Sequence, residues 1–169
     1  MRKPLLILLA TVLMLSLPQK LSAQRVSVST DLLEWCTLSP NAGVELSVSR
    51  HSTILFSASF SPWKVSEGLW LRHVTLTPEW RWWFDVPMSG SSLGLKTVYS
   101  CYDFGGLWGA RAGGHMLGLG AVYGYSAVVN RRVSIRPHIS GGGAVNYNKG
   151  RFSFFPTADI GLDIQIILK

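Results

Sequence analysis

Apolar and polar residues alternate with a period of two along several stretches of the chain. Between residues 74 and 84, one set of alternate positions is apolar or aromatic and the other is mostly polar. From 117 to 129, large apolar residues share one face and small residues the other. Because successive side chains of a β-strand point to opposite faces, this spacing predicts strands. A soluble barrel keeps its large apolar side chains inside, so a continuous apolar face opposite small and charged residues indicates a barrel whose outer solvent is lipid.

Eight segments of suitable length carry this pattern, each bounded by turn-forming residues. The predicted strands cover roughly 25–36, 42–50, 53–61, 71–84, 91–102, 115–129, 133–147 and 155–168. Short connections follow the second, fourth and sixth strands, whereas longer ones at 61–70 and 103–114 follow the third and fifth. Short turns at one end and longer loops at the other are typical of outer-membrane barrels. The sequence therefore predicts an all-β fold, an eight-stranded antiparallel up-and-down transmembrane β-barrel.

Residues 1–23 carry the pattern of an export signal. Arg2 and Lys3 precede an apolar run from Leu5 to Leu17, and Ala23 offers a small residue for cleavage. We therefore expect two parts, a signal peptide at 1–23 that is removed and an outer-membrane barrel domain at 24–169. Removal takes three of the 16 basic residues and leaves 13 against 9 acidic ones, a charge of +4. This mild, scattered charge gives no support for nucleic-acid binding.

Charged residues within the predicted strands fall on the face opposite the apolar one. An Arg or Lys on the lipid face near the bilayer midplane costs about 2–4 kcal/mol, so these side chains are expected to point into the lumen. An eight-stranded barrel is just wide enough for side chains to fill its interior. We therefore expect a plug of ion pairs rather than a conducting pore, formed by Glu45, Glu79, Arg81, Arg136, His138, Asp159 and Asp163, with Lys96 facing the same way.

Aromatic residues gather near the ends of the predicted strands. Trp80, Trp82 and Phe84 lie at the turn end of one strand, where an interfacial girdle is expected. The long connections are candidates for an outer binding surface, since such loops commonly carry function. Their candidate residues are Trp63, Trp70, Trp108 and Arg111.

The sequence offers no motif for catalysis or for a cofactor. The four histidines show neither HxxxH nor HExxH spacing, and the two cysteines form no CxxC. We therefore expect no catalytic, cofactor or metal residues. Cys36 and Cys101 fall on strands at opposite sides of the predicted barrel, beyond the reach of a disulfide, and are expected to be free thiols.

Several motifs resemble those of one family of small outer-membrane barrels. They are Pro40-Asn41-Ala42-Gly43-Val44-Glu45, Pro62-Trp63, Pro78-Glu79-Trp80-Arg81-Trp82-Trp83-Phe84, Leu93-Gly94-Leu95 and Phe155-Pro156-Thr157. The chain resembles a domain-of-unknown-function family of Gram-negative outer-membrane β-barrels, often encoded near fimbrial subunit genes. The resemblance implies an outer-membrane location, contact with outer-membrane lipids, and fimbrial or other surface proteins as partners.

We therefore expect a monomeric, non-enzymatic barrel with a structural or surface-interaction role. Two alternatives stay open at this point: a barrel enzyme that modifies lipid A, and a soluble periplasmic barrel that binds lipid.

Overall fold

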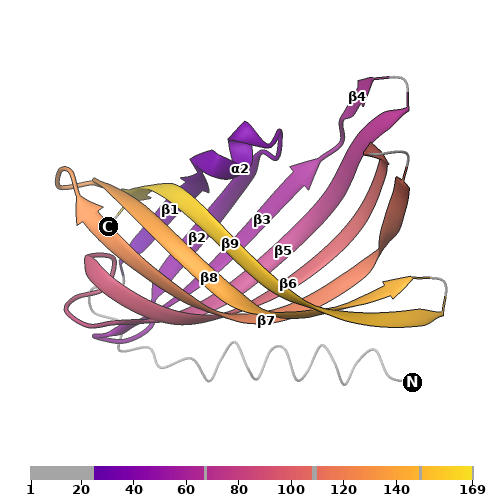
Figure 1. Ribbon diagram of the computed structural model, residues 1–169. Coiled ribbons are helices and arrows are strands. Elements are labelled where there is room, and N and C mark those ends of the chain that lie inside the picture. Colours follow the sequence, from indigo (N-terminus) through magenta and orange to yellow (C-terminus); the bar gives the residue numbers. More distant parts are fainter. Residues whose placement is uncertain (1–24, 67, 108–109, 149, 169) are drawn as a thin grey trace, which may run out of the picture.

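The computed structural model describes residues 25–66, 68–107, 110–148 and 150–168, so the predicted signal peptide at 1–23 lies outside the described residues. The described chain forms one antiparallel sheet that curls into a barrel (Figure 1). Within the described residues no helix is long and apolar enough to cross a membrane. The strands are β1 (Val26–Asp31), β2 (Asn41–Ser47), β3 (Ser52–Ser61), β4 (Lys64–Ser66), β5 (Leu69–Trp83), β6 (Gly90–Leu107), β7 (Ala110–Val128), β8 (Val133–Asn148) and β9 (Arg151–Ile167), with one helix, α2 (Leu32–Cys36).

The ring closes through the pairing of the first strand with the last, and through the pairing of β3 with β5 past the short β4. Strand β1 pairs with β9, and β3 pairs with β5 from Ser52 opposite Trp82 to Ser61 opposite His73. The short β4 pairs only with β5 and stands outside the ring. The described part of the chain thus forms eight antiparallel strands in up-and-down order, which confirms the predicted fold class.

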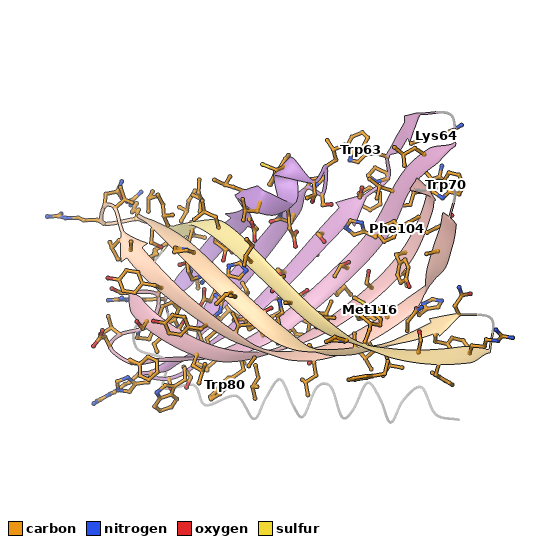
Figure 2. All side chains as sticks on the ribbon, in the orientation of Figure 1. Trp63, Lys64, Trp70, Trp80, Phe104 and Met116 are labelled. Carbon is orange, nitrogen blue, oxygen red and sulfur yellow. The ribbon has the colours of Figure 1, made fainter. Side chains whose placement is uncertain are left out.

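The period of two sets which face of each strand turns outward. Leu76, Trp80, Leu119, Tyr123 and Ile160, all predicted to face outward, expose between 44% and 68% of their surface. The alternate positions bury serine, threonine and charged residues, so the lumen is polar while the outer surface is apolar. Figure 2 shows Trp80 on the outside of the barrel, pointing away from the ribbon. These five outward positions are confirmed, and Leu162, the sixth residue predicted to face outward, is half-buried.

The first predicted strand, 25–36, is wrong in its second half. Strand β1 ends at Asp31, and residues from Leu32 form helix α2. Asp31 caps this helix, because its Oδ1 accepts hydrogen bonds from Leu33 N at 2.7 Å and Glu34 N at 3.4 Å. An aspartate at this position satisfies backbone donors that have no partner within the helix. Cys36 therefore lies at the end of a helix and is exposed.

The two predicted long loops are also wrong, because most of their residues lie in strands, either in the short β4 or in extensions of β5, β6 and β7. Strand β5 begins at Leu69, β6 runs to Leu107 and β7 begins at Ala110. In Figure 1 the extended ends of β5, β6 and β7 lie at the end of the barrel that carries β4. A break in register between Gly105 and Leu107 accommodates Gly106, whose positive φ of 86° suits glycine.

Two prolines lie inside paired strands, where a missing amide would disrupt the ladder. Pro78 pairs with Phe56 on β3, while the pairing of β5 with β6 skips from Leu76 to Glu79. Pro137 pairs with Leu162 on β9, while the pairing of β7 with β8 skips its position. Each proline therefore lies where one of its two neighbouring strands makes no ladder contact with it.

Candidate functional site: the lumen of the barrel

Glu45 on β2 is the centre of a buried network in the lumen, and its side chain has no exposed surface. Its Oε1 accepts a hydrogen bond from Thr53 Oγ1 at 2.5 Å. Its Oε2 accepts three more, from Arg81 Nη1 at 3.2 Å, Arg136 Nη1 at 3.0 Å and Gln165 Nε2 at 2.8 Å. The donors come from β3, β5, β8 and β9, so one carboxylate ties four other strands together across the lumen.

Both arginines of this network also contact a second carboxylate. Arg81 donates to Glu79 through Nε and, at 3.0 Å, through Nη2. Arg136 donates to Asp163 Oδ2 through Nη2 and, at 3.0 Å, through Nε. All four residues are buried. A buried charge is tolerated when it is paired and hydrogen-bonded, and each of these charges has at least one such partner.

Three residues of the network, Thr53, Trp83 and Gln165, are not among the lumen residues predicted from the sequence. Gln165 links Glu45 to Ser27 Oγ at 2.6 Å and accepts from Ser134 Oγ at 3.1 Å. Trp83 is fully buried, and its Nε1 donates to Thr53 Oγ1 at 2.8 Å. The alternation placed Thr53, Trp83 and Gln165 on the inward face, but only their hydrogen bonds reveal a role. With Trp83 and the buried Met88, the end of the lumen that carries the short turns is filled by large side chains.

Asp159 lies apart from the central network. Its Oδ2 accepts from Lys96 Nζ at 2.5 Å, and its Oδ1 accepts from Ser140 Oγ. The side chain of Asp159 is 50% exposed, whereas that of Lys96 is 13% exposed. The structure therefore brings five of the seven predicted lumen residues into one network and places Asp159 in a separate pair. The seventh residue, His138, lies between two carboxylates.

The imidazole of His138 faces Asp31 on one side and Asp163 on the other. Its Nε2 lies 3.8 Å from Asp31 Oδ2, and its Nδ1 lies 3.5 Å from Asp163 Oδ2. Nδ1 is buried and makes no hydrogen bond to the described residues. Gly161 pairs with His138 across the β8–β9 ladder, and a Cβ at this glycine would collide with the imidazole and with Asp31. A cavity of about 150 Å³ opens beside these side chains.

Helix α2 contributes one further acid to this cavity. Glu34 lines it, although the residue as a whole is exposed. Burial of its carboxyl, together with nearby Asp31, Asp163 and Asp159, raises the pKa of Glu34 to about 7. Because α2 also contacts β9, the helix and the acidic end of the lumen form one structural unit.

The predicted outer-loop residues are placed differently from one another. Trp63 is exposed, and its Nε1 donates to the carbonyl oxygen of Leu38 at 2.8 Å. Trp70 is half-buried on β5 and packs over Gly105, where no side chain would fit. Figure 2 shows both tryptophans at the same end of the barrel, opposite Trp80. Trp108 lies outside the described residues, and of Arg111 only the backbone, in β7, is described.

A second polar group lies on the outward face. Cys101 Sγ lies 3.2 Å from His115 Nδ1 and 3.3 Å from Tyr99 Oη, and Tyr99 Oη lies 3.2 Å from His115 Nδ1. The cysteine is free, as is Cys36. Cys101 and His115 lie 14 positions apart and form no motif, and only the pairing of β6 with β7 places these two residues opposite each other.

Chemically, the lumen is suited to holding the strands together. Its two central arginines pair with three carboxylates, and Glu45 uses both of its oxygens to accept hydrogen bonds. Among the described residues, the acidic cluster Asp31–His138–Asp163 is the group of side chains with the geometry to hold an ion.

Comparisons with known proteins identify a family and solved structures that this chain resembles. The family described as "Protein of unknown function (DUF3575)" matches residues 7–160. No curated protein matches the chain. The fold is similar to that of Neisserial surface protein A, with a TM-score of 0.52 and 11% identity, over 85% of this chain and 94% of that one. The N-terminal β-barrel domain of Pseudomonas aeruginosa OprF gives a TM-score of 0.48 and 9% identity, over 86% and 96%.

Proposed function

This chain belongs to the DUF3575 family of proteins of unknown function, and we propose that it is an integral β-barrel of the bacterial outer membrane with a non-enzymatic structural or surface-interaction role. The single observation that carries the proposal is the reversal of polarity across the barrel wall. Leu119 and Ile160 expose 64% and 68% of their surface outward, while Arg136 and Glu45 are fully buried inside. In water this arrangement would expose a large apolar surface at great cost, whereas in a bilayer it is the stable one.

The aromatic side chains support this orientation. Trp80, Trp82 and Phe84 are exposed near the end that carries the short turns. Trp35, Phe60 and Trp63 are exposed near the opposite end. Tryptophan and tyrosine favour the interface between lipid and water, so two aromatic groups separated along the barrel axis match the two surfaces of a membrane.

Cell fractionation combined with heat-modifiable gel mobility tests the location. We expect the protein in the outer-membrane fraction, and we expect the unboiled sample to migrate differently from the boiled one because the closed barrel resists detergent. Recovery in the soluble periplasmic fraction would contradict the proposal and favour a soluble lipid-binding barrel.

An enzyme that modifies lipid A is the second candidate, and one observation favours it. Cys101 and His115 form a thiol–imidazole pair on the outward face, where lipid would contact it. Mass spectrometry of lipid A from a deletion strain tests this function. We expect no change from the wild-type strain. A change that wild-type protein restores and the Cys101→Ser variant does not would establish the enzyme instead.

The surface role is proposed for the end of the barrel that carries α2, β4 and the strand extensions. Trp63 is exposed there beside Lys64 (Figure 2). Surface proteins, fimbrial components among them, are the proposed partners of this monomeric barrel. Crosslinking in native outer membranes, followed by purification and mass spectrometry, tests the role. The crosslinked partners should decrease when Trp63→Ala and Lys64→Ala are combined.

A further inference from the structure

We propose that Asp31, His138 and Asp163 form a binding site for a divalent transition-metal ion inside the barrel, beneath helix α2. One oxygen from each carboxylate and one nitrogen of the imidazole lie within 4.8 Å of one another. The site goes beyond the proposed membrane role and depends only on how β1, β8 and β9 bring these side chains together.

The balance of charge around the cavity favours a cation. Five carboxylates line it, but only two permanently charged cations do, Arg81 and Lys96. Arg136 and Glu45, next to the cavity, cancel each other. Without Glu34, which holds its proton below a pH of about 7, the lining carboxylates Asp31, Glu79, Asp159 and Asp163 still exceed the two cations by two. Buried charges are normally paired or coordinate a metal, so this excess favours a cation.

The geometry requires little rearrangement. Two ligands of one zinc ion, each about 2.0–2.2 Å from it, lie at most about 4.4 Å apart. One ion binds only one of the two imidazole nitrogens, and one such nitrogen lies with one oxygen of each carboxylate within 4.8 Å. This span exceeds the zinc limit by about 0.4 Å, so a small rotation of one side chain would close the site. Asp163 can keep Arg136 on one oxygen while the other turns to the ion, because a carboxylate has two acceptor oxygens.

Space and second contacts also suit an ion. His138 Nδ1 is buried and makes no well-formed hydrogen bond to the described residues, although Asp163 Oδ2 lies 3.5 Å from it. Gly161 leaves the space that a side chain would take from His138 and Asp31. Asp31 Oδ1 is held by Leu33 N and Leu162 N, which fixes the carboxylate and leaves Oδ2 to face the imidazole. Outer contacts that orient a ligand in this way are typical of metal sites.

The donor set indicates the class of ion. Imidazole suits Zn²⁺, Cu²⁺, Ni²⁺ and Fe²⁺, whereas all-oxygen sites suit Mg²⁺ and Ca²⁺. One imidazole with two carboxylates therefore favours Zn²⁺ over Mg²⁺. We expect an open coordination position that water fills, as in zinc sites with three protein ligands.

Zn²⁺ binding to the purified full chain, stripped with a chelator and refolded in detergent, tests the site. We expect one Zn²⁺ per chain by equilibrium dialysis and elemental analysis, with much weaker binding of Mg²⁺. His138→Gln and Asp31→Asn should each weaken binding by roughly 10- to 100-fold or more, as loss of a metal-site contact does. Asn still caps a helix, so Asp31→Asn is expected to keep α2 in place.

His115→Gln is the matched control, because His115 belongs to the outward trio with Cys101. It should leave Zn²⁺ binding unchanged, and Co²⁺ bound to the wild-type chain should show no thiolate charge-transfer band. Zn²⁺ binding that is lost in His115→Gln, or a thiolate band, would move the site to the outward face and overturn the proposal. A folded barrel, judged by its heat-modifiable mobility, that binds no Zn²⁺ would overturn it as well.

Discussion

At the scale of single residues, Glu45 illustrates how the lumen is held together. It has no exposed surface, and one of its oxygens accepts hydrogen bonds from Arg81, Arg136 and Gln165. Removing one member of a buried ion pair leaves the other charge buried without a partner. This destabilises a protein more than replacing both members with apolar residues does. The stability cost of a substitution in this network therefore depends on whether each remaining charged side chain keeps another hydrogen-bonded partner.

We predict that Glu45→Ala lowers the free energy of unfolding by about 3–5 kcal/mol. Glu79→Ala should cost less, because Arg81 keeps its contact with Glu45 at 3.2 Å. Urea titration of the detergent-folded protein, followed by tryptophan fluorescence, measures both. Arg131→Ala in an exposed turn is the control and should stay within about 0.5 kcal/mol of the wild type. An effect of Glu45→Ala as small as the control would show that the network does not stabilise the barrel.

At the scale of elements, helix α2 couples the connection between β1 and β2 to the acidic end of the lumen. Asp31 caps the helix through Oδ1 and faces His138 through Oδ2. Glu34, on the first turn, faces the same group of acids, and its pKa is raised to about 7 from its ordinary value of 4.5. The position of α2 and the ionisation of Glu34 are therefore linked.

We predict that the contribution of Glu34 to stability falls as the pH rises from about 4.5 to about 7. In this window Glu34 holds its proton in the folded chain and loses it on unfolding, so the folded state binds more protons and the free energy of unfolding decreases with pH. Below the window both states are protonated, and the full contribution is present. The charged and titratable neighbours Asp31, Asp159, Asp163 and His138 remain in the Glu34→Gln variant, so its difference from the wild type isolates Glu34. The unfolding midpoint should change less between pH 5 and pH 8 in Glu34→Gln than in the wild type. The same change in both proteins would contradict the prediction.

Strand β7 provides a test of the outward face. We predict that Leu119→Arg, at the middle of this strand, destabilises the barrel in lipid by about 2–4 kcal/mol, while Val129→Arg at its end costs about 0–1 kcal/mol. The two positions are matched in exposure, at 64% and 61%. Equilibrium unfolding from liposomes measures the difference. Equal costs at the two depths would indicate that no bilayer surrounds the barrel.

At the scale of the whole molecule, closure makes the lumen a filled interior rather than a channel. The pairings of β1 with β9 and β3 with β5 complete a ring of eight strands in the described chain. Such a ring leaves an interior that side chains can fill. Here Trp83 and Met88 occupy the turn end, and the arginine–carboxylate network occupies the centre.

We therefore predict that the purified protein shows no stable single-channel current in planar bilayers. A large porin, whose wide lumen holds water, serves as the positive control in the same membranes. Discrete, reproducible openings of the wild-type protein would contradict the filled lumen.

The sequence by itself determined the inward and outward faces, because alternation within a strand is a local property that the backbone imposes on every residue. It also predicted the eight strands. Local spacing missed helix α2, which depends on the capping oxygen of Asp31. It also missed the extension of β6 and β7, which pairing between strands stabilises despite their glycines.

Only the tertiary structure decided which of the inward side chains meet. Glu45 lies 91 residues from Arg136 and 120 from Gln165, and the closed ring places all three together. Asp31 reaches His138 because β1 pairs with β9 and β9 pairs with β8, across a gap left by Gly161. Alternation specifies the face on which a side chain lies. The stagger of the strands around the barrel sets its height in the lumen, and this stagger depends on contacts between distant parts of the chain.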